Sequence, residues 1–368
     1  MMINIIGVGD IMPGGLLSDS NRPCANDGVL DLLQQGDVRC GTLECAFGDQ
    51  PTYDEAKVAD RGNVIYAKDA DIRRLIELQI DIVSLANNHF FDLGAEGAVH
   101  TIELLDAEGI LHCGAGRNLK EAGSPVVVEI QGKKVAFLAF CDTIYSHVYY
   151  CTYATDNSPG VNPMKEEYVI SEIKKNVAKY DYVVVLAHWG TEHTFYPNVS
   201  VVKMAEMMLK AGATVVLGSH PHCIQPVINT ANRSVVFSMG NFLFPERLIA
   251  PPKVTYYPDE PIDYSALPVT DEYPLVDCVT LKTLPYWARV GLIVETHIDT
   301  NSAISDYRFS YLDENNCLKL LDENHSKEAN KKLSFLTILL KSRLYILYMF
   351  FGRIVNSVLI RLKRLIGK

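Results

Sequence analysis

Apolar and polar residues along the first 245 positions alternate between two kinds of pattern. Short apolar runs, typical of buried strands, cover residues 3–9, 38–44, 81–86, 110–114, 182–188 and 214–220. Segments with apolar residues at helical spacing cover residues 71–79, 94–107, 164–179 and 200–212. Because strands that alternate with helices form βαβ units, this order predicts an α/β fold with parallel strands.

Three further stretches have the pattern of β-hairpins. These stretches are 126–140, which contains a Gly turn, then 223–240, and finally 289–313. Hairpins add antiparallel strands to a parallel sheet. The mixture therefore predicts two sheets that pack face to face and are flanked by helices.

Residues 245–286 have a different composition, with eight prolines and five tyrosines. We expect a long loop that forms a lid over the site, and the alternative is a linker. The predicted domains are a first one over 1–320, which includes this segment, and a helical tail over 321–368.

Charge separates the tail from the rest of the chain. Residues 331–368 hold nine Lys or Arg and no Asp or Glu, whereas the preceding 330 residues hold 25 basic and 44 acidic groups. The body therefore has a net charge of −19 and is not expected to bind nucleic acid. The basic, amphipathic tail predicts attachment to an anionic membrane surface. The alternatives are that it packs on the body or on a second subunit of a homo-oligomer.

The beginning of the chain bears on its location. MMINIIGVGD has no basic region and no small-residue cleavage site, so we expect no signal peptide. No uncharged apolar run approaches the ~20 residues of a membrane span. These features predict a cytoplasmic protein that lies peripherally at the membrane if its tail binds lipid.

Polar side chains follow five of the predicted strands at the point where each strand ends. They are Asp10, Glu44, Asn88, His89, His188, His220 and His222. Ligands of α/β proteins bind beyond the carboxyl ends of strands, so we expect these side chains to converge. Carboxylates with imidazoles suit Mn²⁺, Fe or Zn²⁺ better than an all-oxygen site would. The pattern predicts one or two divalent metal ions.

Six ordered motifs within residues 3–245 make the pattern more specific. They read GVGDIMPGG, TLECAFGD, SLANNHFFDLG, AHWGTEH, GSHPHCIQP and FSMGNFLF. Together they resemble the CapA family of poly-γ-glutamate capsule synthesis proteins, which is itself similar to calcineurin-like metallophosphoesterases. The resemblance implies a four-layer α/β/β/α sandwich with a dinuclear metal centre.

The resemblance also implies roles for the residues at the strand ends. Asp10 and His222 would bind one metal, Asn88, His188 and His220 would bind the second, and Glu44 would stand at the bridging carboxylate position. One departure from the superfamily lies in its Asp-x-His motif, because Met12 replaces the His and leaves the first metal about three protein ligands. A second is that Gly218-Ser219 replaces a Gly-His pair.

Five residues are candidates for catalysis or substrate binding. His89 takes the place of the general acid, and Asp92 either orients that imidazole or caps the helix near residue 93. Trp189 either lines the pocket or packs in the core. Glu192 completes the first metal's shell or contacts substrate, and Asn241 contacts substrate or holds its turn.

Two functions fit these residues. The first is a metal-dependent, phosphoesterase-like hydrolase of capsule or envelope polymer biosynthesis. The alternative is a non-catalytic, metal-dependent binding component of an anionic-polymer synthesis or export complex, and a degenerate scaffold is a third reading. The expected partner is an anionic polymer or a phosphorylated glycan.

Overall fold

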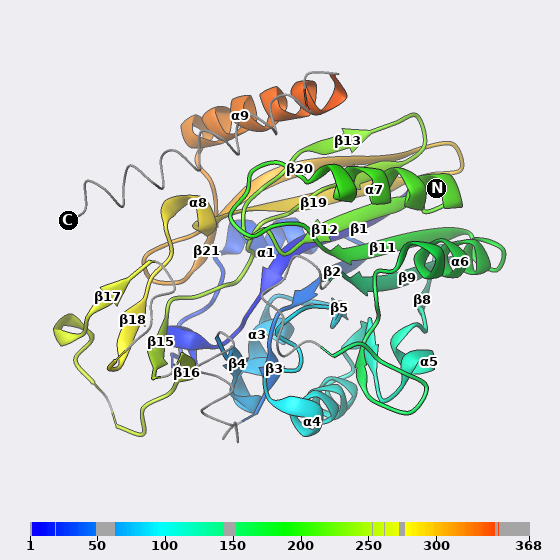
Figure 1. The fold of residues 1–368 in the computed structure, drawn as a ribbon. Coiled ribbons are helices and arrows are strands. Elements are labelled where there is room, and N and C mark those ends of the chain that lie inside the picture. The colour runs from blue at the N-terminus through cyan, green and yellow to red at the C-terminus, as the bar shows by residue number, and fades with distance from the viewer. Residues whose placement is uncertain are drawn as a thin grey trace.

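Two large β-sheets pack face to face in the computed structural model, and helices cover their outer faces (Figure 1). The structure describes residues 2–18, 20–48, 63–142, 152–251, 253–260, 262–271, 277–342 and 345. The predicted α/β class with four layers is therefore confirmed.

The first sheet combines parallel strands with the closing hairpin. In order across the sheet its strands are β21 (Leu318–Leu320), β20 (Ala303–Leu312), β19 (Val290–Ile298), β1 (Ile3–Ile11), β2 (Val38–Leu43), β5 (Ile82–Ser84) and β6 (Leu111–Cys113). The strands β1, β2, β5 and β6 are parallel, and β19 pairs with β1 in the antiparallel sense. The predicted hairpin over 289–313 is confirmed as β19 and β20.

The second sheet has a parallel centre with an antiparallel strand at each edge. In order its strands are β13 (Val227–Asn229), β14 (Ser234–Val236), β12 (Val215–Ser219), β11 (Tyr182–His188), β9 (Lys133–Cys141) and β8 (Val126–Ile130). The edge strands β13 and β8 form the other two predicted hairpins. The central strands all run in one direction, so their carboxyl ends meet at one edge.

The helices divide between the two outer faces. Those that share a buried apolar cluster with the first sheet are α1 (Asp27–Leu33), α3 (Arg73–Glu77) and α4 (Gly94–Ala107). Those that cover the second sheet are α6 (Glu166–Val177) and α7 (Val199–Ala211). The remaining helical segments are η1 (Gly15–Leu17), η2 (Asp69–Ile72), α5 (Leu119–Ala122), η3 (Tyr264–Ala266), α8 (Tyr286–Arg289) and α9 (Glu323–Lys341).

Alternate residues of β11 explain why the second sheet is covered on both faces. Val183 and Val185 pack with α6 and α7, whereas Val184 and Leu186 belong to the cluster between the sheets. Strands buried on both faces read as continuous apolar runs, which is the pattern of residues 182–188. Burying each such side chain stabilises the fold by about 1.5–3 kcal/mol.

The Pro- and Tyr-rich segment, predicted as a long loop, contains short strands, and its role as a lid stays a prediction. It forms a small sheet of β15 (Arg247–Ala250), β16 (Val254–Tyr256), β17 (Val269–Thr270) and β18 (Thr280–Lys282), in the order β16-β15-β18-β17. Two further short pairs are β3 (Ala46–Phe47) with β4 (Tyr66–Ala67) and β7 (Ala115–Gly116) with β10 (Gly160–Val161). This small sheet lies beside the ends of the strands that carry the site (Figure 1).

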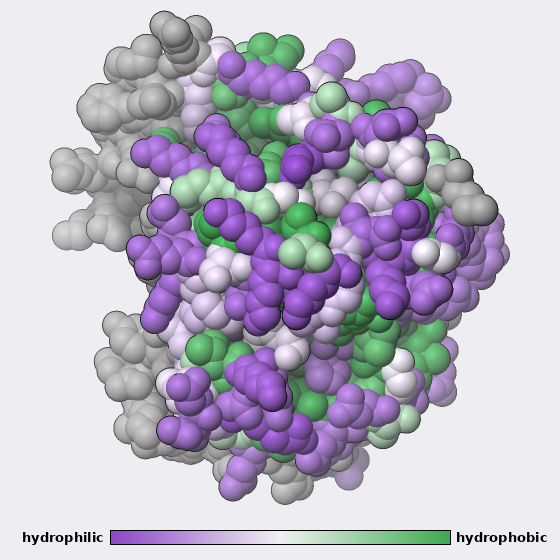
Figure 2. Space-filling model, turned by 90° about the vertical axis from the view of Figure 1, so that its right-hand side faces the viewer, coloured by the Kyte–Doolittle hydropathy of each residue, from purple (hydrophilic) through white to green (hydrophobic). Residues whose placement is uncertain are grey.

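The predicted tail begins as helix α9. Leu333 and Leu336 are buried against the body, whereas Phe335 and Ile338 are exposed. Among the described residues no helix is both long and apolar enough to cross a bilayer. On the face shown in Figure 2, apolar residues lie in small groups among polar ones. The predicted basic face beyond residue 345 lies outside the described residues.

Candidate metal centre

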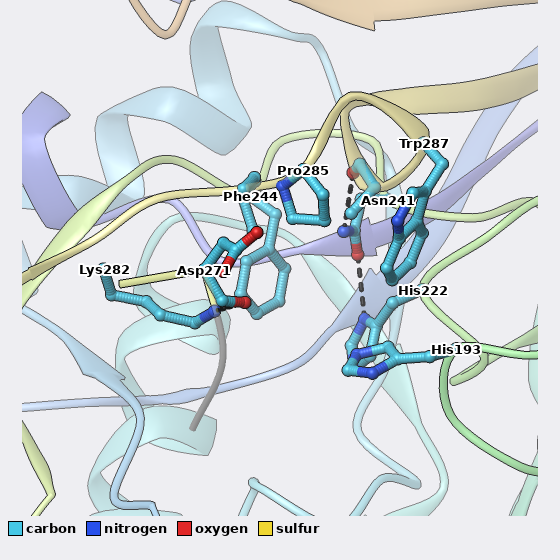
Figure 3. Close-up of a pocket in the computed structure, with 10 residues that line it drawn as sticks. His193, His222, Asn241, Phe244, Asp271, Lys282, Pro285 and Trp287 are labelled. Carbon is cyan, nitrogen blue, oxygen red and sulfur yellow. Dashed lines mark hydrogen bonds between the residues drawn. The ribbon is translucent and has the colours of Figure 1, made fainter. Parts of the chain in front are cut away.

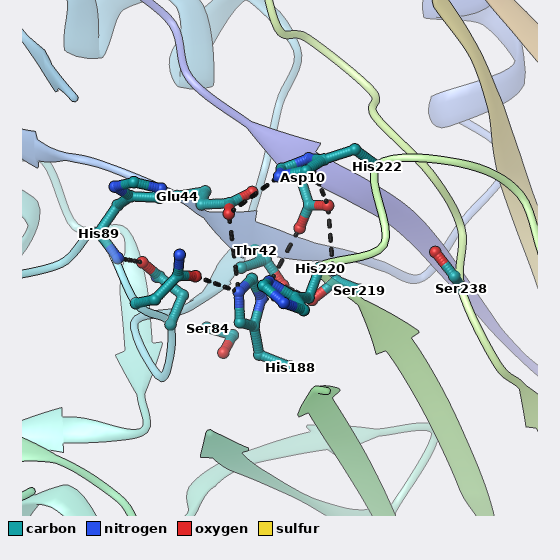
Figure 4. Close-up of polar contacts among 12 residues, drawn as sticks. Asp10, Thr42, Glu44, Ser84, His89, His188, Ser219, His220, His222 and Ser238 are labelled. Atoms are coloured by element: carbon teal, nitrogen blue, oxygen red, sulfur yellow. Dashed lines mark hydrogen bonds and ion pairs between the residues drawn. The ribbon is translucent and has the colours of Figure 1, made fainter. Parts of the chain in front are cut away.

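The carboxyl ends of strands from both sheets meet at one buried cluster (Figure 4). Asp10 lies near the end of β1 and Glu44 directly follows β2, while His188 ends β11 and both His220 and His222 follow β12. All five side chains are buried. The predicted convergence of these residues is therefore observed in the structure.

The segment that follows β14 joins the two sheets at this cluster. The backbone N–H of Asp10 donates to the Gly240 carbonyl over 3.0 Å, and the N–H of Phe242 donates to the Asp10 carbonyl over 2.9 Å. A Cβ at Gly9 would lie 1.8 Å from the Gly240 oxygen. Glycine is therefore required at position 9, because any side chain would push this segment away from β1.

The ligand atoms form two groups that share one carboxylate. The first group is Glu44, His188 and His220, and the second is Asp10, Glu44 and His222. Within each group, the ligand atoms lie within 4.8 Å of one another. Glu44 Oε1 lies 3.6 Å from His188 Nε2 and 3.5 Å from His222 Nε2. Each group is a candidate site for one cation, and Glu44 belongs to both.

Three buried carboxylate oxygens in this cluster fit a bound cation. Asp10 Oδ1 and both carboxylate oxygens of Glu44 are buried and have no hydrogen-bond partner among the described residues. Buried carboxylate oxygens are costly unless they are hydrogen-bonded or coordinate a metal. The donor set, carboxylates with imidazoles, fits Mn²⁺, Fe or Zn²⁺.

Burial also shifts the protonation of these groups. It raises the pKa of Asp10 to about 7 and raises that of Glu44 well above its usual range, with the Asp10 charge adding to the shift at Glu44. It lowers the pKa of His222 to about 3 and that of His188 well below its usual range. Without a cation, the cluster therefore favours neutral imidazoles and protonated acids.

Polar neighbours orient His188. Its Nε2 lies 2.7 Å from Asn88 Oδ1, which places the predicted amide ligand beside the first group. Its Nδ1 lies 2.9 Å from the Ser219 hydroxyl, and that hydroxyl lies 3.0 Å from the Thr42 hydroxyl. Such contacts fix the ring orientation of metal-binding histidines. Sequence analysis noted Ser219 only as a departure from relatives.

Asn241 orients the His222 ring in the same way. Its Oδ1 lies 2.9 Å from His222 Nδ1, and its Nδ2 donates to the Ala288 carbonyl over 2.9 Å. The second bond fixes the amide so that its oxygen faces the imidazole. Asn241 therefore orients His222, and it also lines the pocket described below.

Three histidines at the site have left-handed backbones. The φ angles are 59° at His193, 94° at His220 and 54° at His222. Residues other than glycine rarely adopt such angles, which cost of order 1–3 kcal/mol each and cluster at functional sites. The turn after β12 is therefore strained so that His220 and His222 reach the cluster.

His89 and Asp92 form a hydrogen-bonded pair next to Asn88. His89 Nδ1 lies 2.7 Å from Asp92 Oδ2, and that buried oxygen also accepts the Ile65 N–H over 2.7 Å. Asp92 does not cap α4 in the described structure, because the N-cap position is Leu93, Asp92 Oδ2 pairs with His89 and Ile65, and Oδ1 has no hydrogen-bond partner among the described residues. Of the two predicted roles for Asp92, the structure favours orientation of the imidazole.

The other two candidates differ in their surroundings. Trp189 is wholly buried in the cluster under α6 and α7, and its Nε1 donates to the Phe237 carbonyl over 2.8 Å. The structure therefore gives it the packing role and not the pocket-lining one. Glu192 is half-buried. Burial alone would raise its pKa, but the charges of nearby imidazoles, first His220 and then His222, outweigh this effect and lower the pKa.

A pocket of about 420 Å³ opens beside the cluster (Figure 3). Its lining includes His222, His193, Asn241, Phe244, Trp287 and Lys282. The Trp287 and His193 rings lie 5.1 Å apart. Sequence analysis missed Trp287 and Lys282, because they come from the C-terminal part of the chain, where no motif marks them.

Comparisons with known proteins give a family and two similar relatives. The family model described as bacterial capsule synthesis protein PGA_cap matches residues 4–246. The chain is 30% identical over 247 residues to the capsule biosynthesis protein CapA of Bacillus anthracis, covering 64% of this chain and 58% of the relative. It is 30% identical over 243 residues to the PGA biosynthesis protein CapA of Bacillus subtilis (strain 168), covering 64% and 62%. The matched region thus spans about three fifths of each relative.

One solved structure with a partial likeness is NAD nucleotidase of Haemophilus influenzae. It is 10% identical, the match covers 91% of this chain and 62% of that one, and the TM-score is 0.41. At this score the likeness carries no argument about the present chain.

Proposed function

Because the chain belongs to the PGA_cap family of bacterial capsule synthesis proteins, we propose that it is a metal-dependent, phosphoesterase-like hydrolase of capsule or envelope polymer biosynthesis. The observation that carries this proposal is the buried cluster of Asp10, Glu44, His188, His220 and His222, with carboxylate oxygens that lack hydrogen-bond partners among the described residues.

The two groups that share Glu44 would hold one or two divalent ions, Mn²⁺, Fe or Zn²⁺. Asn88 would add its amide oxygen to the group that contains His188. A bound cation in such a site polarises a phosphoryl oxygen and makes water more acidic. Asn241 and Ser219 would keep the imidazoles of His222 and His188 in the orientation that presents their other nitrogen to the ion.

His89 is the residue proposed to transfer a proton. It follows Asn88 directly, its side chain is largely buried, and Asp92 holds its Nδ1, so its Nε2 is the nitrogen left for substrate. In that position His89 would protonate the oxygen of the departing group. Asp92 would hold the orientation of the imidazole.

The proposed substrate is an anionic polymer or a phosphorylated glycan. Two similar relatives are named for capsule and PGA biosynthesis, which supports an envelope polymer as the substrate class. Glu192 and Asn241 are the residues proposed to contact it, since Asn241 lines the pocket and Glu192 lies among the imidazoles. Both would act beside the metal ligands.

One observation favours the alternative, a metal-dependent binding component without turnover. Met12 stands where related phosphoesterases have a metal-binding His, and its side chain is wholly buried. The group of Asp10, Glu44 and His222 is therefore one imidazole short of that pattern. A site with fewer ligands would bind a polymer carboxylate or phosphate without cleaving it.

The proposal is tested with protein loaded separately with Mn²⁺, Fe²⁺ and Zn²⁺ and assayed on a panel of phosphomonoesters and phosphodiesters. We expect hydrolysis that Asp10→Asn and His188→Ala abolish. His100→Ala is the matched control, since His100 is half-exposed and pairs with Asp69 away from the site. Bound metal without turnover would support the binding alternative, and protein that binds no metal would contradict both.

A further inference from the structure

The guanidinium of one buried arginine near the candidate metal centre has no hydrogen-bond acceptor in the part of the chain that the structure describes. Arg247 begins β15 and is only 1% exposed. Its Nε and both terminal nitrogens have no hydrogen-bond partner among the described residues. Burying a guanidinium without a hydrogen-bond acceptor is strongly unfavourable, and a bound anion is one kind of group that would supply the acceptor.

The neighbour of Arg247 across the small sheet is a second buried cation. In the antiparallel pair of β15 and β18, Arg247 lies directly opposite Lys282, which is 2% exposed. Opposed residues project to the same face with Cβ atoms about 4.5–5.5 Å apart, and like charges in such pairs are destabilising. Lys282 Nζ donates to the backbone carbonyl of Asp271, which also lines the pocket, whereas the Arg247 nitrogens have no acceptor among the described residues.

The position of Arg247 connects this pair to the pocket. Its guanidinium carbon lies 5.5 Å from the centre of the Phe244 ring, and that ring lies 5.5 Å from the His222 ring. Phe244 and Lys282 both line the pocket (Figure 3). The charge of Arg247 also lowers the pKa of Glu44 and Asp92, which burial otherwise raises. The guanidinium therefore lies against Phe244, a residue of the pocket wall whose ring is next to His222.

We propose that Arg247 and Lys282 bind an anionic group of the substrate, a phosphate or a carboxylate, next to the metal centre. This inference rests on the proposed function, in which the pocket receives the substrate. Arg247 suits the task because its planar group offers parallel N–H donors to a carboxylate or phosphate, and Lys282 adds a second charge. The pair would select anionic polymers over neutral glycans.

The test is calorimetric binding of inorganic phosphate and of a γ-linked glutamate dipeptide to metal-loaded protein. We expect Arg247→Gln to weaken binding at least tenfold while its metal content stays at the wild-type level. Arg247→Lys should weaken it less, because it keeps the charge and loses the paired donors. Tighter binding of phosphate supports a phosphorylated substrate, and tighter binding of the dipeptide supports a polyglutamate chain.

A matched control is Arg233→Gln. Arg233 is half-buried at the opposite end of the second sheet, where its guanidinium donates to the Leu209 and Ala213 carbonyls. Its loss should lower the melting temperature and leave anion binding unchanged. Arg247→Gln should instead leave the melting temperature of the anion-free protein unchanged or raise it, because it removes an unpaired buried charge. If Arg247 only stabilised the fold, Arg247→Gln would lower the melting temperature and leave anion binding unchanged.

The inference is overturned if Arg247→Gln binds both probes as tightly as the wild type. If Arg247→Gln does not fold, the affinities of Arg247→Lys and the wild type are compared instead. Equal affinities for both probes would overturn the inference. Its failure is separate from that of the proposed function. If the wild type hydrolyses substrate and Arg247→Gln binds anions as tightly as the wild type, only the anion site is contradicted. If anion binding depends on Arg247 but the wild type shows no turnover, only the proposed hydrolysis is contradicted.

Discussion

The protonation of individual residues at the metal centre follows from burial. Carboxylates cut off from water hold their protons, and imidazoles in the same surroundings stay neutral. The pKa of Asp10 is raised to about 7 and that of His222 is lowered to about 3 for this reason. A divalent cation reverses the effect on the carboxylates by supplying the missing charge.

This gives a prediction for metal-free protein. The folded state holds a proton on Asp10 up to about pH 7, whereas the unfolded state releases it near 3.8. Raising the pH between these values therefore favours unfolding, by up to about 1.4 kcal/mol per pH unit for this group. Asp10→Asn lacks the titrating group, so its free energy of unfolding should rise relative to the wild type over that window.

The measurement is chemical denaturation of both proteins at several pH values in the presence of a chelator. Added metal should remove most of the pH dependence of the wild-type free energy of unfolding over this window, because the cation keeps Asp10 ionised in the folded state. A constant difference between the two proteins from pH 4 to 7 would contradict the shifted pKa.

A second prediction concerns the proton donor. His89→Ala should retain its metal and lose about 10²- to 10⁴-fold in turnover, because a general acid contributes a factor of that size. Asp92→Asn should lose less and keep metal, since it only holds the imidazole. Metal content and turnover are measured on the same samples. Wild-type turnover in His89→Ala would remove this residue from the mechanism.

The sequence alone could give the candidate metal-binding residues because each lies at the end of an apolar run. Parallel strands bring their carboxyl ends together, so position in the pattern predicts position in space. Arg247 and Lys282 could not be found in this way. Their importance depends on a cross-strand pairing within a segment whose prolines hide its strands. Trp189 follows a ligand in sequence, yet its side chain points into the core.

Between elements, the decisive feature is the crossing of the segment after β14 onto β1. Gly9 allows this approach, since a Cβ there would lie 1.8 Å from a backbone oxygen of Gly240. The same crossing places Asn241 beside His222 and pairs it with Asp10. The segment that joins the two sheets therefore also positions a residue of the site.

We therefore predict that Gly9→Ala destabilises the protein strongly. The free energy of unfolding should fall by more than about 2 kcal/mol, because backbone must move to admit the methyl group. Metal affinity should fall with it. The matched control is Gly28→Ala in α1, where the nearest atom lies 3.7 Å from the added Cβ. Thermal and denaturant unfolding measure the stability of the two variants. Equal stability of Gly9→Ala and Gly28→Ala would contradict the close approach of Gly240 to Gly9.

Elements buried on both faces were predictable, and the short strands were not. Runs such as residues 182–188 are apolar throughout, which favours a strand whatever its neighbours. The strands of the small sheet have two to four residues and are interrupted by prolines. Tertiary pairing creates these strands, so local pattern predicted a loop.

At the scale of the whole molecule, the chain divides into an acidic body and a basic end. Helix α9 buries Leu333 and Leu336 on the body and leaves Phe335 and Ile338 exposed. Residues 346–368 carry five basic and no acidic residues. This composition supports the proposal that the tail binds anionic membrane surfaces.

Deleting residues 346–368 tests that proposal without touching the buried part of α9. We expect the full chain to sediment with vesicles that contain anionic lipid, and the shortened chain to remain in the supernatant. Salt should weaken the binding, because the attraction is electrostatic. Equal sedimentation of both proteins would contradict a lipid-binding tail.

The account depends most on a cation in the cluster that Glu44 shares, and elemental analysis of the purified protein measures this directly. We predict one or two equivalents of Mn, Fe or Zn per chain, lost in a His188→Ala variant that remains folded. Wild-type protein that holds no more metal than this variant, even after incubation with each ion, would contradict the account.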